Sequence, residues 1–215
     1  MPSAAEQLAS SVNFGAIAKA TELKQRIIFT LLALIVYRLG TYLPIPGINP
    51  GALDDIFNQN TGGILGMFDM FAGGALSRMS IFALNIMPYI SASIIIQLMS
   101  TASSHLAQLK KDGDSGRQKI IQYTRYGTVL LASVQALGIA TGLESMTNSQ
   151  GPAVDNPGIF FKMSTIITLT GSTVFLMWLG EQITARGIGN GISLIIFAGI
   201  VAELPAALIS TLELG

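Results

Sequence analysis

Residues that could carry out covalent chemistry are scarce in this chain of 215 residues. It contains one histidine, His105, and no cysteine, so a zinc site has too few of its usual ligands. The glycine-rich stretch 187–191 resembles a phosphate-binding loop, but no Gly-Lys-Ser/Thr follows it, and a turn with Asn190 at a helix N-cap is the favoured interpretation. No serine-nucleophile motif and no pair of carboxylates lies inside an apolar run. We therefore expect no catalytic residues, no metal and no cofactor.

Polar residues inside an apolar run carry the functional signal instead. In the run 79–99, positions 86, 90, 93 and 97 share one helical face, because they are three or four residues apart. This face reads Ile86, Ile90, Ser93 and Gln97. A stripe facing lipid would be apolar throughout, since polar groups are costly in hydrocarbon. The pattern predicts a narrow apolar constriction that opens into a wet vestibule. The alternative is plain helix packing, with Ser93 and Gln97 bonded to neighbouring helices.

Five apolar runs have the length of membrane helices, which need about 17–25 residues. We predict an all-α integral membrane protein with spans at 27–43, 79–99, 126–143, 159–179 and 188–208. Half of the residues are hydrophobic and 11% are charged, whereas ordinary globular chains carry about 25% charged residues. The polar residues 1–20 lack the apolar core and cleavage site of a removable signal peptide. We expect segment 1–26 to be a cytoplasmic N-terminus, on the distribution of basic residues described below.

A short apolar segment, 64–72, precedes the second span and is too short to cross a bilayer. Its large apolar side chains are Ile64, Leu65, Met67, Phe68, Met70 and Phe71. We predict a re-entrant helix hinged on Gly73 and Gly74, because glycine adopts backbone angles that other residues avoid. Irregular backbone at membrane depth is tolerated only where protein or a water-filled cavity covers it. The segment therefore indicates a pore or a binding cavity.

Basic residues gather in alternate loops, which predicts the orientation in the membrane. Nine of the twelve are Lys19, Lys24, Arg26, Lys110, Lys111, Arg117, Lys119, Arg125 and Arg186. The loops 44–63 and 144–158 contain none. Because short cytoplasmic loops carry the excess of Lys and Arg, we predict a cytoplasmic N-terminus and an external residue 215. Arg38, near the outer end of the first span, could extend toward water or find a partner.

Several strings resemble the bacterial SecY family, the channel-forming subunits of the Sec protein translocase. They are Pro44–Ile48 (PIPGI), Met70–Arg78 (MFAGGALSR), Ile86–Gln97 (IMPYISASIIIQ), Gln122–Gly127 (QYTRYG), Met177–Thr184 (MWLGEQIT) and Arg186–Ser193 (RGIGNGIS). The resemblance runs from the first span to the fifth. It implies five transmembrane helices and a short plug helix, which make up half of an inverted-repeat channel of ten helices.

The resemblance also implies roles for individual residues and partners. Segment 64–72 would be a plug that closes the pore from outside. Ile86, Ile90 and Ile196 would belong to a ring of aliphatic side chains around the passing polypeptide, and one side of a lateral gate to lipid would hold Ser93, Ile94 and Gln97. The implied partners are the small membrane subunits SecE and SecG, the SecA motor or a translating ribosome, signal peptides and nascent chains. The implied location is the bacterial inner membrane.

Two departures from the family pattern leave alternatives open. The family has ten spans, so we expect the missing C-terminal half of the channel on a longer or separate chain. The sequence would then be a fragment, a split gene product or a truncated one. Asn85 stands where the family motif has glycine. A small secondary transporter would also use broken helices, and a membrane scaffold would need no pore. Ion flux or polypeptide crosslinking in liposomes separates these classes.

Overall fold

Helices make up nearly all of the regular structure. The computed structural model describes residues 21–49, 69, 72–145, 147–148 and 151–213. Its helices are α3 (Thr21–Gly40), α6 (Met87–Ala102), α7 (Ser104–Lys111), α8 (Gly113–Ser145), α9 (Ile159–Arg186) and α10 (Gly191–Glu213). The only strands among the described residues are β1 (Thr147–Asn148) and β2 (Gly151–Pro152), which pair antiparallel. The predicted all-α class is confirmed at this level.

Long apolar helices run side by side through the molecule. Within the described part, α8 and α9 are long and apolar enough to cross a membrane, while α6 and α10 contain shorter apolar stretches. α8 packs along α9 and also contacts α6 and α7, and α10 packs against α9 and α3. Small buried side chains recur every four residues along α8, at Thr124, Thr128, Ala132, Ala136 and Ala140. Such residues let helix backbones approach closely.

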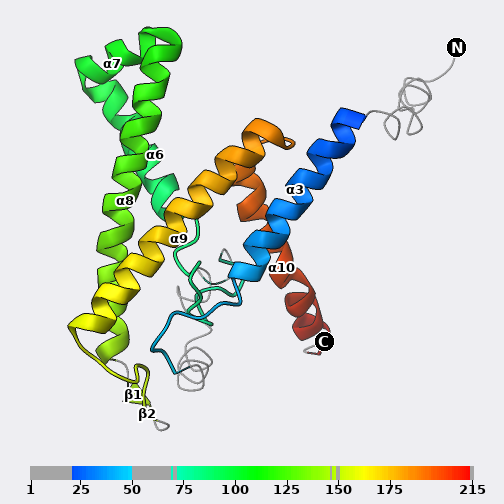
Figure 1. The fold of residues 1–215 in the computed structure, drawn as a ribbon, viewed down its shortest axis with the longest axis vertical. Helices are drawn as coiled ribbons and strands as arrows, with labels where there is room; N and C mark the ends of the chain where they lie inside the picture. The colour runs from blue at the N-terminus through cyan, green and yellow to red at the C-terminus, as the bar shows by residue number, and fades with distance from the viewer. Residues whose placement is uncertain (1–20, 50–68, 70–71, 146, 149–150, 214–215) are drawn as a thin grey trace, which may run out of the picture.

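The helices have two distinct ends in Figure 1. The start of α3 and the turn between α7 and α8 lie at one end, which we call the inner end. The β1–β2 hairpin and the end of α10 lie at the opposite end, which we call the outer end. Successive long helices thus alternate in direction, as the predicted spans require.

The second predicted span is helical only in its later part. Residues 81–86 form turns, and α6 begins at Met87, with Pro88 in its first turn. Proline lacks the N–H donor that a helix interior needs, but the first turn makes no use of that donor. The prediction of a span over 79–99 is therefore wrong as a helix before Met87. Pro88 fits the start of a helix and not its interior.

Asn85 has a backbone conformation that few residues other than glycine adopt. Asn85 has a φ of 49°, in the left-handed region. Glycine adopts this conformation without steric cost, and asparagine is among the few other residues that adopt it readily. The conformation of this position therefore suits asparagine as well as glycine.

Polar tails extend the other helices beyond the apolar runs. α3 begins at Thr21, before the predicted 27–43, and α8 begins at Gly113, well before 126. α9 continues to Arg186, beyond the predicted end at 179. A search for apolar runs detects only the part of a helix that avoids water, so it misses the turns that project toward the inner end.

Two isolated bridges hold the loop after α3 at the outer end. Pro44 forms an antiparallel bridge with Ser80, flanked by N–H···O distances of 3.0 and 2.8 Å. Ile48 forms a second antiparallel bridge with Val154. Ile48 and Val154 are buried. The loop is thereby attached both to the residues that precede α6 and to those that precede α9.

Candidate functional site

The three isoleucines assigned to the ring by resemblance line one cavity. Ile86, Ile90 and Ile196 border a space of about 200 Å³, together with Asn85 and Met87. The Ile86 carbonyl accepts a hydrogen bond from the Ile90 N–H at 3.1 Å, so Ile86 is the N-cap of α6. Ile196 comes from α10, far along the chain. The fold therefore brings the predicted residues together from two separate elements to form an apolar wall. We call this space the ring cavity.

The three side chains differ in how firmly they are held. Ile86 is 1% exposed and belongs to a buried cluster with Phe82, Leu176 and Ile195. Ile90 and Ile196 are only partly buried. Ile86 is thus part of the core, while Ile90 packs against that core and keeps part of its surface exposed.

The residues assigned to the lateral gate follow the cavity along α6. Ile94 is exposed, and the Gln97 Nε2 group donates to the Ser93 Oγ at 3.2 Å. Both residues of this bond lie on α6. The packing alternative predicted bonds to neighbouring helices instead. Gln97 is exposed as well, so this face of α6 has an open side.

A larger cavity of about 650 Å³ lies between α6, α8 and the residues before α6. Ser91 contributes from α6, and Gln135 and Gly138 contribute from α8. Asn85 and Met87 border this cavity as well as the ring cavity. The start of α6 therefore forms the partition between the two spaces.

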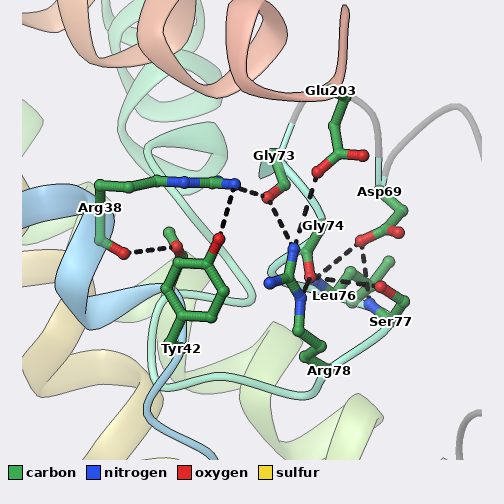
Figure 2. Close-up of polar contacts among 10 residues, drawn as sticks. Arg38, Tyr42, Asp69, Gly73, Gly74, Leu76, Ser77, Arg78 and Glu203 are labelled. Atoms are coloured by element: carbon green, nitrogen blue, oxygen red, sulfur yellow. Dashed lines mark hydrogen bonds and ion pairs between the residues drawn. The ribbon is translucent and has the colours of Figure 1, made fainter. Parts of the chain in front are cut away.

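The predicted hinge glycines have unusual backbone angles and fixed carbonyls. Gly73 and Gly74 have φ angles of 65° and 73°. Arg38 Nη1 donates to the Gly73 carbonyl at 2.9 Å, and Arg78 Nε donates to the Gly74 carbonyl at 2.9 Å (Figure 2). The large apolar side chains of the predicted plug, Ile64, Leu65, Met67, Phe68, Met70 and Phe71, lie outside the described residues.

Sequence reasoning missed the polar cluster around these glycines. Arg38 Nη2 also donates to the Tyr42 hydroxyl at 3.1 Å, so the partnered alternative for Arg38 is the correct one. The guanidinium carbons of Arg38 and Arg78 lie 5.1 and 4.6 Å from the centre of the Tyr42 ring. Glu203, on α10, pairs with Arg78 at 3.6 Å. The available signal was that these charged residues fall near the outer ends of predicted spans, where an unpaired charge is costly.

Local geometry bears on the interpretations of Asn190 and His105. The Asn190 Oδ1 atom accepts hydrogen bonds from the N–H groups of Ile192 and Ser193, which confirms a cap at the start of α10. His105 is exposed on α7, as expected for a surface residue. Within the described residues, no group of three or more His, Asp or Glu side chains could hold a metal ion.

Comparison with known proteins gives consistent matches. Residues 80–215 match the SecY family model. Protein translocase subunit SecY of Escherichia coli K12 is 59% identical over 89% of this chain and 43% of its own length. The protein of the same name from Rickettsia bellii RML369-C is 59% identical over 91% of this chain and 45% of its own length. The chain spans less than half the length of these curated relatives.

Solved structures share the fold. One is described as the structure of a protein conducting channel, and another as Sec61 in the canine ribosome-channel complex from the endoplasmic reticulum. Each matches with a TM-score of 0.60 at 20% identity, over 82% of this chain and 36% of the other. With a family model that matches well over half of the chain, and relatives that align along nearly all of it, the chain belongs to the SecY family.

Proposed function

We propose that the protein forms the N-terminal half of a protein-conducting channel, which passes unfolded polypeptides across a membrane and releases hydrophobic segments sideways into lipid. The ring cavity carries this proposal, because Ile86 and Ile90 meet Ile196 from a distant helix at one apolar space. Relatives named as protein translocase subunits and a fold shared with a protein conducting channel support it.

An aliphatic constriction suits this function physically. A narrow apolar passage sheds water and so blocks ions without a charged gate. The side chains of Ile90 and Ile196 offer no hydrogen-bonding groups, so a passing polypeptide finds an unselective surface that does not hold it. Transport of this kind requires no covalent chemistry by the channel itself.

The finer architecture is part of the same proposal. Helices α3, α6, α8, α9 and α10 would be the five spans, and segment 64–72 the plug. A complementary C-terminal half, related by inverted topology, would supply the rest of the ring and the opposite wall of the lateral gate. The open face of α6 at Ser93, Ile94 and Gln97 supports a gate at this position.

We propose an inner-membrane location with the inner end in the cytoplasm. The exposed basic residues of the α7–α8 turn support this orientation. The proposed partners are SecE and SecG in the membrane, signal peptides and nascent chains as cargo, and SecA or a translating ribosome as the source of energy. A fold shared with a channel solved in a ribosome-channel complex supports partners of this type.

Crosslinking to a stalled polypeptide tests the channel function. Single cysteines replace Ile90, Ile196 or Ile95 in the full-length channel, which is reconstituted in liposomes with a polypeptide arrested during transport. Ile95 is the matched control, since it lies on α6 and is 46% exposed. We expect crosslinks from positions 90 and 196 and none from 95. Equal crosslinking at all three positions, or none at any, would contradict the proposal.

Reporter fusions test the orientation. Fusions after residues 55, 113, 152, 186 and 215 should report outside, inside, outside, inside and outside. The expectation follows from the one-sided distribution of basic residues. A reversal at any of the last three positions would exclude the five-span arrangement.

A further inference from the structure

Residues 72–78, which we call the arginine-bound segment, are attached to two helices at once. From α3, Arg38 donates to the Gly73 carbonyl at 2.9 Å. On the other side, Glu203 of α10 pairs with Arg78, whose Nε donates to the Gly74 carbonyl at 2.9 Å. Figure 2 shows the segment between the two sources of contact. Hydrogen bonds with a charged donor are about twice as strong as neutral ones.

Neighbouring atoms also leave little room for a side chain at Gly73 and Gly74. A Cβ atom on Gly73 would lie 3.0 Å from the Cα and carbonyl oxygen of Gly199 on α10. On Gly74 it would lie 2.7 Å from the Glu203 Oε1 atom and closer still to Arg78. The neighbour of Gly73 is helix backbone, which cannot easily move, so the segment rests directly on α10 at this residue.

Asp69, which lies just before the arginine-bound segment in the chain, braces it. The Asp69 Oδ1 atom accepts hydrogen bonds from the N–H groups of Leu76 and Ser77, both at 2.9 Å. The Asp69 carbonyl accepts a third from the Gly74 N–H at 3.0 Å. These bonds tie Gly74, Leu76 and Ser77 to one residue, so this part of the segment would move as a unit.

One face of α10 joins this segment to the ring cavity. Ile196, Gly199 and Glu203 are spaced by three and four residues, so they lie on the same side of the helix. Along that side, the helix lines the cavity, touches Gly73 and then pairs with Arg78. A movement of α10 that widens the cavity at Ile196 would therefore also draw it away from the segment.

We propose that Arg38, Arg78 and Glu203 are positioning residues that latch the arginine-bound segment between α3 and α10, so that widening of the ring cavity and release of the segment are one coupled step. The proposal rests on the channel function proposed above. It assigns the glycine pair a second role: a fixed attachment point in the resting state, in addition to a hinge.

Resting ion leak through the full-length channel in proteoliposomes tests the latch. We expect Arg78→Gln to raise the leak roughly tenfold, the scale of one charge-assisted hydrogen bond. Glu203→Gln should raise it about threefold, since the Arg78–Glu203 pair is partly exposed and screened. The double variant should leak no more than Arg78→Gln alone, because both changes break the same contact.

A second outer-end ion pair provides the control. Lys162 and Glu144 are 2.9 Å apart and join α9 to the end of α8, away from the glycines. Lys162→Gln should leave the leak unchanged, and Arg78→Lys, which keeps a cation but loses the Nε geometry, should give an intermediate value. An unchanged leak in Arg78→Gln and Glu203→Gln channels that still transport polypeptide would overturn the latch, as would an equal rise in Lys162→Gln.

The assay separates the latch from the channel function. Polypeptide transport by the wild-type channel is measured in the same vesicles. If the wild type conducts ions only and never passes polypeptide, the proposed function fails, whatever the variants do. If it transports polypeptide and the variants remain tight, the latch alone fails.

Discussion

At the outer end, Arg38, Arg78 and Lys162 each contact another part of the chain, whereas the basic residues of the α7–α8 turn at the inner end are exposed. The outer contacts are the Gly73 carbonyl for Arg38, the Glu203 carboxylate for Arg78 and the Glu144 carboxylate for Lys162. The exposed inner residues are Lys110, Lys111, Arg117 and Lys119. The same residue types thus attach segments at one end and face the surroundings at the other.

The difference shows how position decides what a charge does. The outer basic residues lie in or beside apolar helices, where a cation needs protein groups to replace its hydration. The inner residues lie on polar extensions of the helices, where water or lipid headgroups can serve. The outer basic residues therefore help to hold the structure together, whereas the exposed residues of the α7–α8 turn do not.

Arg125, toward the inner end, contacts another part of the chain in the way that the outer basic residues do. Arg125 of α8 donates to both carboxylate oxygens of Glu181 on α9, at 3.0 and 2.6 Å. This two-bond geometry fixes orientation as well as distance. The pair lies where the apolar packing of the two helices gives way to their polar extensions, and both side chains are partly exposed.

The largest difference in stability between the two ends should appear when one glycine at each end is replaced by alanine. Gly74 and Gly113 have similar φ angles, 73° and 69°, but a Cβ would meet Arg78 and Glu203 at Gly74 and nothing within 4 Å at Gly113. Alanine at either position costs about 1–2 kcal/mol for its left-handed backbone. We expect Gly74→Ala to cost at least about 1 kcal/mol more than Gly113→Ala. Thermal unfolding of the purified full-length protein measures both, and equal losses would mean that close approach at Gly74 has no energetic weight.

A smaller effect is expected at the Arg125–Glu181 pair. Arg125→Gln should lower the free energy of unfolding by about 0.5–1 kcal/mol, because partial exposure weakens the pair. A cycle with Glu181→Gln isolates the coupling between the two side chains. Lys119→Gln, an exposed neighbour on α8, is the control and should be nearly neutral. A coupling indistinguishable from zero would show that the pair orients α8 and α9 without stabilising them.

The smallest effect on stability should come from the α7–α8 turn. Replacement of Lys110, Lys111, Arg117 and Lys119 together by glutamine should change the free energy of unfolding by less than about 0.5 kcal/mol for each site. The same variant should weaken the orientation signal, so a reporter at residue 113 should give a mixed result. A large loss of thermal stability with unchanged orientation would reverse the contrast drawn between the two ends.

The apolar runs were sufficient to predict where the long helices lie, because burial in lipid selects apolar residues directly. They could not show that the chain turns between Met79 and Ile86, since those residues are as apolar as the helix that follows. Pro88 gave the needed signal. Its position at a helix start, rather than inside a span, follows from the proline ring itself.

The candidate site also has a part that could be predicted from the sequence and a part that could not. The family resemblance identified Ile86, Ile90 and Ile196, and the structure brings them to one cavity. Local patterns could not reveal the contacts of Arg38 and Arg78 with the glycine carbonyls. These contacts join α3, α10 and the residues before α6, and their proximity depends on the packing of the whole chain.

The bridge between Pro44 and Ser80 has a consequence for the length of the chain between them. The pairing closes the base of the chain that runs between them. A change in length at residues 50–63, ahead of the proposed plug, should therefore leave the helices beyond that base undisturbed. A flexible insertion that doubles a closed loop costs only about 0.6 kcal/mol. Homologues and engineered proteins could therefore gain or lose residues in this stretch, or carry an inserted tag or fluorescent probe, while the helical framework assembles as before.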